Sequence, residues 1–172
     1  METSGGVGIT IAPMHAKVAT VIGSQVVTSW ASAPGVRRSM QANRGKDTSL
    51  ELAVRSALHR SGLRFRKNTR PVPHLRCEAD VLFPAIRLAV FMDGCFWHGC
   101  PTHATRPATH QEWWARKLDR NVARDRENDL LLEDAGWTVL RLWEHEQIAD
   151  SVRKVADLVL ELRARRSTAQ TE

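Results

Sequence analysis

Two short apolar runs near the middle of the chain constrain its fold more than any other feature. They span residues 79–83 and 86–92, and only Pro84 and Ala85 separate them. Both runs are rich in β-branched, aliphatic and aromatic residues, which is typical of buried strands, and the proline indicates a turn. The sequence therefore predicts a central hairpin of two buried strands, which the rest of the chain has to cover.

Helices and further strands are predicted on both sides of this hairpin. Thr48 and Glu51 form an S/T-x-x-E capping box ahead of a run with helical spacing, and Gly62 ends that helix. A later helix ends in the same way at Gly136. The elements around the hairpin are predicted in this order: helix 48–61, strand 63–67, surface loop 70–73, and then, after the hairpin, loop 94–109, helix 111–135, buried strand 138–143 and helix 148–163. This order predicts an α/β fold with a mixed sheet and helices on its faces.

The composition fits one soluble domain. The chain has 172 residues, of which 42% are hydrophobic and 26% charged, and this is enough for one packed core. No stretch approaches the roughly 18 uninterrupted apolar residues of a membrane span, so we expect a soluble protein. Three cysteines are too few for a disulfide framework, and we expect a reducing compartment. Residues 1–30 have no clear period, and we expect a weakly ordered arm there.

Positive charge is concentrated in one segment of the chain. The net charge is +6 overall, but residues 37–76 hold eleven Lys and Arg residues against Asp47 and Glu51, a net charge of +9. Arginine accounts for 20 of the 25 cationic residues, and its planar guanidinium suits phosphates and base edges. The segment is therefore either a nucleic-acid-binding surface or a solvated basic face.

Two aspartates stand at the ends of the predicted hairpin strands. Asp80 is near the start of the first strand and Asp93 follows the second, so the hairpin can bring both carboxylates to one edge of the sheet. Paired acids at such an edge can hold a hard cation such as Mg²⁺, which keeps waters for a phosphate substrate. Glu51 can supply a third oxygen if its helix packs across the hairpin. The alternatives are structural, with Glu51 as a cap residue and the aspartates as turn residues.

A second group of chemically active side chains follows the hairpin. Cys95, Cys100 and His103 lie close together in the predicted loop, and His145 comes just after the last predicted strand. Two cysteines and two histidines are the composition of a closed structural zinc site, and the alternative is a pair of buried cysteines with solvated histidines. His98 stands between these ligands and is a candidate general base for a water that attacks phosphorus.

Aromatic and basic side chains gather in and after the same loop. Trp97, Trp113 and Trp114 are three of the six tryptophans, and Phe96 adjoins Trp97 in a glycine-flanked loop where burial is difficult. Apolar wedges of this kind unstack DNA when they enter between base steps, although core packing is the default for any one indole. The next predicted helix carries side chains that either face phosphates or form a solvated face: Lys117, Arg120, Asn121, Arg124 and Arg126.

Several of these motifs together resemble the very short patch repair (Vsr) family of DNA mismatch endonucleases. The most specific is the string Asp93-Gly94-Cys95-Phe96-Trp97-His98-Gly99-Cys100, with Gly136-Trp137 and Trp143-Glu144 further on. The others are Met40 with Asp47-Thr48-x-x-Glu51, Ala79-Asp80-Val81 and Asn121-x-x-Arg124-Asp125. The resemblance runs from about Trp30 to Glu146, and we assign residues 31–172 to a Vsr-like endonuclease domain.

The resemblance implies a restriction-endonuclease-like (PD-(D/E)XK) fold and a particular reaction. That reaction is a Mg²⁺-dependent nick on the 5′ side of the thymine in a T:G mismatch, which deamination of 5-methylcytosine leaves behind. By position, Asp80 would be the central metal ligand, Glu51 the helix acid and His98 the base. The structural zinc ligands would be Cys95, Cys100, His103 and His145. Phe96, Trp97 and Trp114 would form the wedge that opens the duplex, and Met40, Lys117 and Asn121 would lie near the mismatched pair.

Two departures from the family pattern bear on the mechanism. The best-known member has a histidine where this chain has Asp93, and it binds its zinc with one more cysteine and one fewer histidine. Asp93 is therefore a candidate for an added Mg²⁺ ligand. Ala79 replaces the proline that usually precedes the active aspartate, and this change at a turn should leave Asp80 in place.

The resemblance also implies where the protein works and with what. The expected partner is double-stranded DNA with a T:G mismatch, in the bacterial cytoplasm at the nucleoid and without a membrane. We expect a monomer, because a nick needs only one active site, and recruitment of mismatch-repair proteins is left open. Two other functions stay open as well: a restriction-type or defence nuclease of the same fold, and a non-catalytic, zinc-stabilised DNA-binding module. The flanking bases that are recognised do not follow from the sequence.

Overall fold

The computed structural model describes residues 19–22, 25–28 and 46–169 of a chain that forms two units, Met1–Asn43 and Arg44–Glu172. In the first unit, β1 (Ala19–Ile22) and β2 (Gln25–Thr28) pair in antiparallel fashion. The sequence predicts no strand in this segment, because strands of four residues are too short to show a clear alternation. Met40, which we expect near the mismatch, lies outside the described residues.

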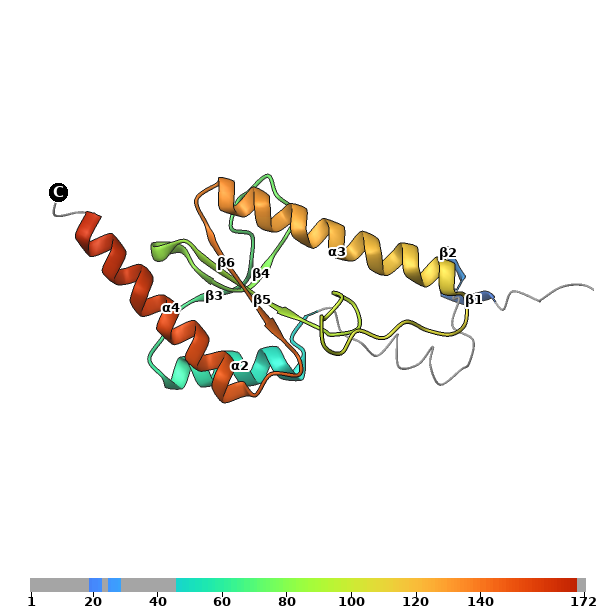
Figure 1. Cartoon of the computed structure of the whole chain (residues 1–172), viewed down its shortest axis with the longest axis horizontal. Coiled ribbons are helices and arrows are strands. Elements are labelled where there is room, and N and C mark those ends of the chain that lie inside the picture. Colours follow the sequence, from blue (N-terminus) through green and yellow to red (C-terminus); the bar gives the residue numbers. More distant parts are fainter. Residues whose placement is uncertain (1–18, 23–24, 29–45, 170–172) are drawn as a thin grey trace, which may run out of the picture. The chain divides into compact units, whose positions relative to one another are not determined.

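The second unit contains a four-stranded mixed sheet with the strand order β3-β4-β5-β6 (Figure 1). Its strands are β3 (Arg66–Thr69), β4 (Ala79–Phe83), β5 (Leu88–Asp93) and β6 (Thr138–Trp143). β4 runs antiparallel to both β3 and β5, and Val81 lies opposite Val90 in the central hairpin. β5 and β6 are parallel, so Asp93 lies opposite Trp143 where both strands end. The predicted hairpin and mixed sheet are confirmed.

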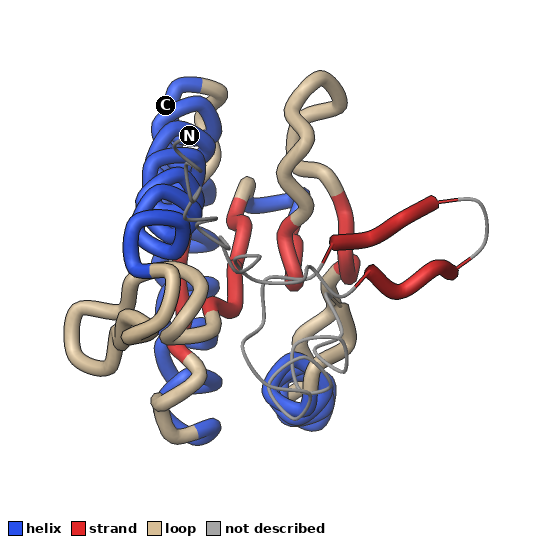
Figure 2. Tube along the Cα trace, turned by 90° about the vertical axis from the view of Figure 1, so that its right-hand side faces the viewer, coloured by secondary structure: helices blue, strands red, loops and turns tan. Residues whose placement is uncertain are grey.

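Helices lie on both sides of this sheet (Figures 1 and 2). They are α2 (Ser49–Arg60), α3 (Gln111–Asp134) and α4 (Ile148–Ala169). α2 and α4 contact each other, and their residues Val54 and Val155 are buried in one core together with Val90. Leu132 of α3 packs in a second core with Ala89. Because side chains alternate along a strand, neighbouring residues of β5 serve opposite cores. Among the described residues, no helix has the length and apolar character that crossing a membrane requires.

Helix boundaries follow the predicted capping signals. The backbone N–H of Glu51 donates to the Thr48 hydroxyl at 3.3 Å, which makes Thr48 the N-cap of α2. Gly62 and Gly136 follow the last residues of α2 and α3 with φ of +78° and +77°, a conformation that favours glycine. These local signals place both helices to within a residue or two of their predicted bounds.

Four elements differ from the prediction. The strand predicted over 63–67 occupies 66–69, because Leu63 is buried at the end of α2, where its N–H donates to the Leu58 carbonyl. The turn after β4 is a longer 3-10 turn, Pro84–Ile86, which delays β5 to Leu88. β6 is an edge strand, so Leu142 is its one fully buried residue and the predicted burial is only partial. Helix α4 also runs past residue 163, to Ala169.

Candidate active site and metal centre

A cleft of about 590 Å³ brings together the four residues that the sequence predicts to be catalytic. Glu51 reaches it from α2, Asp80 from β4, Asp93 from the end of β5, and His98 from the loop that follows β5. Residues of α3 and β6 also line it, among them Asp125. Residues as far apart as 51 and 98 in the sequence therefore share one solvent-accessible site.

Asp80 is a partly buried carboxylate whose surroundings disfavour its charged form. One of its oxygens, Oδ2, accepts the backbone N–H of Met92 at 2.7 Å, and the other lies 3.9 Å from the Arg55 guanidinium. Burial, with help from the negative charges of Glu51 and Asp93, raises the pKa of Asp80 from 3.8 to about 6, against the opposing effects of the Met92 hydrogen bond and Arg55. A cation bound at Asp80 would offset both the burial penalty and the repulsion from Glu51 and Asp93, so this carboxylate is a candidate metal ligand.

Glu51 is both a cap residue and a member of the cleft. Its carboxylate accepts the Thr48 hydroxyl at 3.0 Å and the backbone N–H of Asp47 at 3.0 Å, as a capping glutamate does. Arg55, one turn further along α2, donates to the same carboxylate at 2.8 Å. Glu51 is therefore a cap residue, as the structural alternative states, and its role as a metal-binding acid stays a prediction.

Arg55 is a buried residue that sequence reasoning missed. Its guanidinium donates to Glu51, to Asp47 at 2.6 Å, to Asn68 at 2.7 Å and to the backbone carbonyl of Asp80 at 3.1 Å. These acceptors come from α2, β3, β4 and the segment before α2. Arg55 thus fixes the position of two acids in the cleft, and no local pattern in α2 distinguishes it from an exposed arginine.

His98 is held by an acid that the prediction did not include among the site residues. Its Nδ1 lies 2.6 Å from Oδ2 of Asp125 on α3, and 3.6 Å from Oδ1 of Asp93. Burial opposes the charged imidazolium, but the hydrogen bond to Asp125 and the charges of Asp93 and Asp125 outweigh it and raise the pKa of His98. The same pair lowers the pKa of Asp125 against the effect of its burial. With Nδ1 donating to Asp125, Nε2 is the nitrogen that can accept a proton.

The motif Asn121-x-x-Arg124-Asp125 contains the signal that could have identified this acid. In the sequence, this motif counts only as part of the family resemblance, and it predicts no role for Asp125. In the structure, the Asp125 carboxylate contacts the His98 imidazole. An aspartate on a long polar helix has no feature by itself that separates it from a solvated one. Its partner is a residue 27 positions away in the chain.

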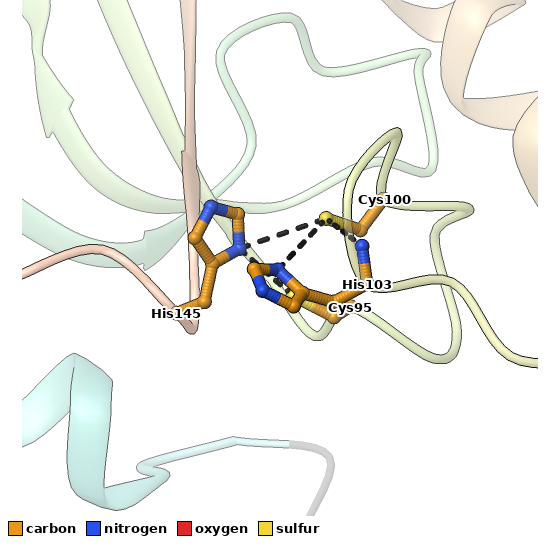
Figure 3. A group of neighbouring side chains, drawn as sticks. All are labelled: Cys95, Cys100, His103 and His145. Carbon is orange, nitrogen blue, oxygen red and sulfur yellow. Dashed lines mark hydrogen bonds between the residues drawn. The ribbon is translucent and has the colours of Figure 1, made fainter.

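The two cysteines and two histidines of the predicted zinc site come together (Figure 3). One ligand atom from each of Cys95, Cys100, His103 and His145 lies within 4.8 Å of all the others. The Cys95 and Cys100 sulfurs are 3.1 and 3.6 Å from Nδ1 of His145, and Cys100 is 3.9 Å from Nδ1 of His103. Tetrahedral zinc, with bonds of about 2.3 Å to sulfur and about 2.0 Å to nitrogen, places such atoms roughly 3.5 Å apart. The donor set and its spacing therefore fit a metal ion.

The parallel pairing of β5 and β6 explains why these ligands meet. Asp93 and Trp143 are opposite each other at the ends of the strands, so Cys95 and His145, each two residues further on, leave the sheet side by side. The backbone N–H of Cys95 also donates to the Glu144 carboxylate at 2.7 Å. The sequence predicts both strands, and only their pairing brings the ligands together.

The aromatic side chains form one cluster beside the loop. Phe96, Trp97 and Trp114 have ring centroids 4.9 to 5.9 Å apart, and the Lys117 ammonium lies 5.3 Å from the Trp97 ring. Trp114 is 5% exposed and belongs to the packed base of the cluster, whereas Phe96 and Trp97 are half-buried. Asn121 donates to the backbone carbonyl of Trp97 at 3.3 Å. Apart from Met40, the residues predicted to bind DNA therefore lie together.

Comparisons with known proteins agree with the motifs. Residues 34–104 match the family model described as DNA mismatch endonuclease Vsr. The chain is 48% identical over 125 residues to the type II nicking enzyme V.NaeI of Lentzea aerocolonigenes, an alignment that covers 72% of this chain and 75% of that protein. It is 40% identical over 114 residues to the type II nicking enzyme V.XorIIP of Xanthomonas oryzae pv. oryzae, covering 64% and 79%.

A further relative carries the family's own name. The chain is 35% identical over 108 residues to the DNA mismatch endonuclease Vsr of Escherichia coli, covering 62% of this chain and 67% of that protein. The chain therefore belongs to the Vsr family of DNA endonucleases, as its motifs predict.

Proposed function

We propose that this protein nicks duplex DNA on the 5′ side of the thymine in a T:G mismatch, by Mg²⁺-dependent hydrolysis of one phosphodiester bond. The mismatch that deamination of 5-methylcytosine creates would be its natural substrate, in the cytoplasm at the nucleoid. The observation that carries the proposal is the meeting of Asp80 with the paired His98 and Asp125 in one cleft. The names of relatives in the same family, a mismatch endonuclease and nicking enzymes, support the reaction class.

Asp80 would hold the Mg²⁺ ion, with Glu51 and Asp93 as the neighbouring acids. Bound Mg²⁺ would supply positive charge for the scissile phosphate and keep water in its coordination shell. The antiparallel pair of β4 and β5 that carries the acids supports a restriction-endonuclease-like (PD-(D/E)XK) core. β5, with the sequence Leu-Ala-Val-Phe-Met-Asp, has no lysine at all, so the lysine of that motif has no counterpart on this strand.

His98 would be the general base. In the neutral imidazole with Nδ1 donating to Asp125, Nε2 carries no proton, which is the arrangement in which an imidazole takes a proton from the attacking water. The carboxylate also stabilises the imidazolium that forms when the proton arrives. Asp125 therefore orients the base and lowers the free energy of its charged form.

The cluster of Cys95, Cys100, His103 and His145 would hold a structural zinc ion. All four positions of a tetrahedral ion would be taken by the protein, which is typical of a site that fixes a loop and takes no part in catalysis. Phe96 and Trp97 in that loop would then enter the duplex beside the mismatch, supported by Trp114 beneath them. Lys117, Asn121 and Met40 would contact the mismatched pair. The protein would act as a monomer, because one nick needs only one active site.

The proposal is tested with end-labelled duplexes that differ only in one T:G mismatch in place of C:G, across several flanking sequences. We expect the protein with Mg²⁺ to nick beside the thymine, and we expect Asp80→Asn, which keeps the shape of the side chain, to bind the duplex without nicking it. Cleavage of the fully paired duplex would instead indicate a restriction-type nuclease. Binding by the wild type without any cleavage would indicate a DNA-binding module.

A further inference from the structure

The network around Arg141 has no task in the proposed reaction so far, although it lies in the same cleft. Arg141 stands on β6, and its Nε and Nη2 atoms each lie 2.8 Å from a carboxylate oxygen of Asp129 on α3. Its Nη1 donates to Oδ2 of Asp93 at 2.7 Å, and Nη2 also donates to the backbone carbonyl of Asp125 at 3.3 Å. One guanidinium therefore joins β5, β6 and α3.

These contacts bear on how His98 is held. Asp93 is only 4% exposed, and its Oδ1 lies 3.6 Å from the same imidazole nitrogen that Asp125 contacts at 2.6 Å. Without a cation of its own, Asp93 would be a second buried negative charge that competes for Nδ1. Arg141 binds the opposite oxygen of Asp93, which neutralises this carboxylate and holds it back from the ring.

The remaining contacts of the guanidinium act on α3. The bidentate pair with Asp129 and the hydrogen bond to the Asp125 carbonyl fix the turn of the helix that carries the Asp125 side chain. Arg141 thus makes two separate sets of contacts, one to β5 and one to α3, and both hold a neighbour of the same imidazole in place. The planar fork of arginine suits three acceptors in fixed directions, which a lysine ammonium does not.

We propose that Arg141 is a positioning residue: it holds Asp93 and the Asp125 turn of α3 so that Asp125 alone orients His98. The inference rests on the proposed function, because it assigns a task within the same site. It also assigns Asp93 to the arginine and the histidine, and not to the catalytic metal. The oxygen Oδ2 of Asp93 is bound to the guanidinium, and Oδ1 faces the imidazole.

Kinetic comparison of Arg141→Leu and Arg141→Lys with the wild type tests this task. The control is Arg153→Leu, which removes an exposed arginine of α4 that pairs with Asp150 outside the cleft. Single-turnover nicking of a mismatched duplex is measured with protein in excess, and DNA affinity and zinc content are measured in parallel. We expect Arg141→Leu to nick about 100-fold more slowly, the size of effect that a misplaced catalytic group causes, at unchanged affinity and zinc content.

Partial rescue by a variant that keeps the charge and loses the fork separates the two sets of contacts. Arg141→Lys keeps the charge beside Asp93 but cannot make the bidentate pair with Asp129, so it should recover the rate only in part, to within about tenfold of the wild type. Arg153→Leu should nick at the wild-type rate. A wild-type rate in Arg141→Leu, or a loss of DNA affinity as large as the loss of rate, would overturn the proposal.

Asp93→Asn tests the assignment of Asp93 away from the metal. The variant should nick more slowly, because Arg141 loses its ionic partner, while the Mg²⁺ concentration for half-maximal rate stays within about twofold of the wild type. A magnesium ligand would behave differently, since removing one charged oxygen should raise that concentration by about tenfold or more. Such a rise would refute the assignment.

Proton NMR supplies a measurement that does not depend on activity. The proton between His98 and Asp125 should give a strongly downfield signal, which Asp125→Asn identifies by removing it. We expect Arg141→Leu to lose or broaden this signal and Arg153→Leu to keep it. An unchanged signal in Arg141→Leu would overturn the inference. If the wild type nicks no duplex but the signal behaves as expected, the proposed function fails while the positioning role of Arg141 stands.

Discussion

Replacing Asp80 with asparagine should make the metal-free protein more stable, because the charged carboxylate destabilises the folded state. The pKa of Asp80 is about 6 in the folded chain and 3.8 without the influence of the fold, so the folded state binds the proton more tightly. This group therefore favours folding most below pH 3.8, and its contribution falls as the pH rises through 6. The difference of about 2 pKa units corresponds to about 3 kcal/mol above pH 6.

Asparagine removes the charge and keeps the shape of the side chain. Its carbonyl oxygen can still accept the backbone N–H of Met92, which donates to Asp80 at 2.7 Å. The Asp80 side chain is 22% exposed, so water screens the penalty only in part. We expect Asp80→Asn to raise the free energy of unfolding by about 2 to 3 kcal/mol at pH 8, and by only about 1 kcal/mol at pH 4.5, where the folded wild type is mostly protonated.

Urea unfolding of both proteins at the two pH values, without Mg²⁺, measures this difference. Asp150→Asn, an exposed aspartate of α4 that is 46% accessible, is the matched control and should change stability by less than about 0.5 kcal/mol at either pH. Mg²⁺ should stabilise the wild type and leave Asp80→Asn unchanged, because ligand binding stabilises only the protein that binds it. An Asp80→Asn protein that is no more stable than the wild type at pH 8, or equally stabilised at both, would refute this reasoning.

Three further predictions concern the acid that pairs with the proposed base, one of the proposed zinc ligands, and a glycine in the loop after β5. Asp125→Asn should lower the single-turnover nicking rate by about 100-fold and leave DNA affinity in a gel-shift assay unchanged. Cys100→Ser should lose the bound zinc in elemental analysis and lower the melting temperature, because an open site binds the metal more weakly. Gly99→Ala should destabilise the protein by about 1 to 3 kcal/mol in urea unfolding. Its φ is +67°, and a Cβ there would lie 2.7 Å from a methyl of Val122 on α3.

Much of the fold is predictable because its signals are local. The capping box at Thr48, the glycines after α2 and α3, and the apolar runs of β4 and β5 each specify a boundary or an element within a few residues. The hairpin of β1 and β2 gives no such signal, since neither strand is long enough to show its period. Local patterns also identify residue types with chemical roles, which is why the sequence predicts the four side chains of the candidate metal centre.

The parts of the site that sequence reasoning missed are contacts between distant segments. Arg55 reaches the backbone of Asp80 25 positions away, and Arg141 reaches Asp93 48 positions away. No spacing rule links such pairs, because the partner is determined by how helices and strands pack. Asp93, whose role as a Mg²⁺ ligand stays a prediction, illustrates the difficulty. Its place at the end of a strand is predicted correctly. The sequence does not reveal that it forms an ion pair with Arg141, because β6 lies far from β5 in the chain and becomes its neighbour only in the folded sheet.

The metal centre and the cleft are joined through the ends of β5 and β6, and this connection bears on what a structural metal does here. The N–H of Glu144 donates to the Asp93 carbonyl at 3.0 Å, and the Glu144 carboxylate accepts the N–H of Cys95 at 2.7 Å. His98 lies between Cys95 and Cys100, so a metal bound to both cysteines holds the short segment at each end. Such a restraint would keep the His98 imidazole in place, 2.6 Å from the Asp125 carboxylate. A zinc ion bound at this cluster would therefore help to determine where His98, the proposed base, stands, without contacting the phosphate.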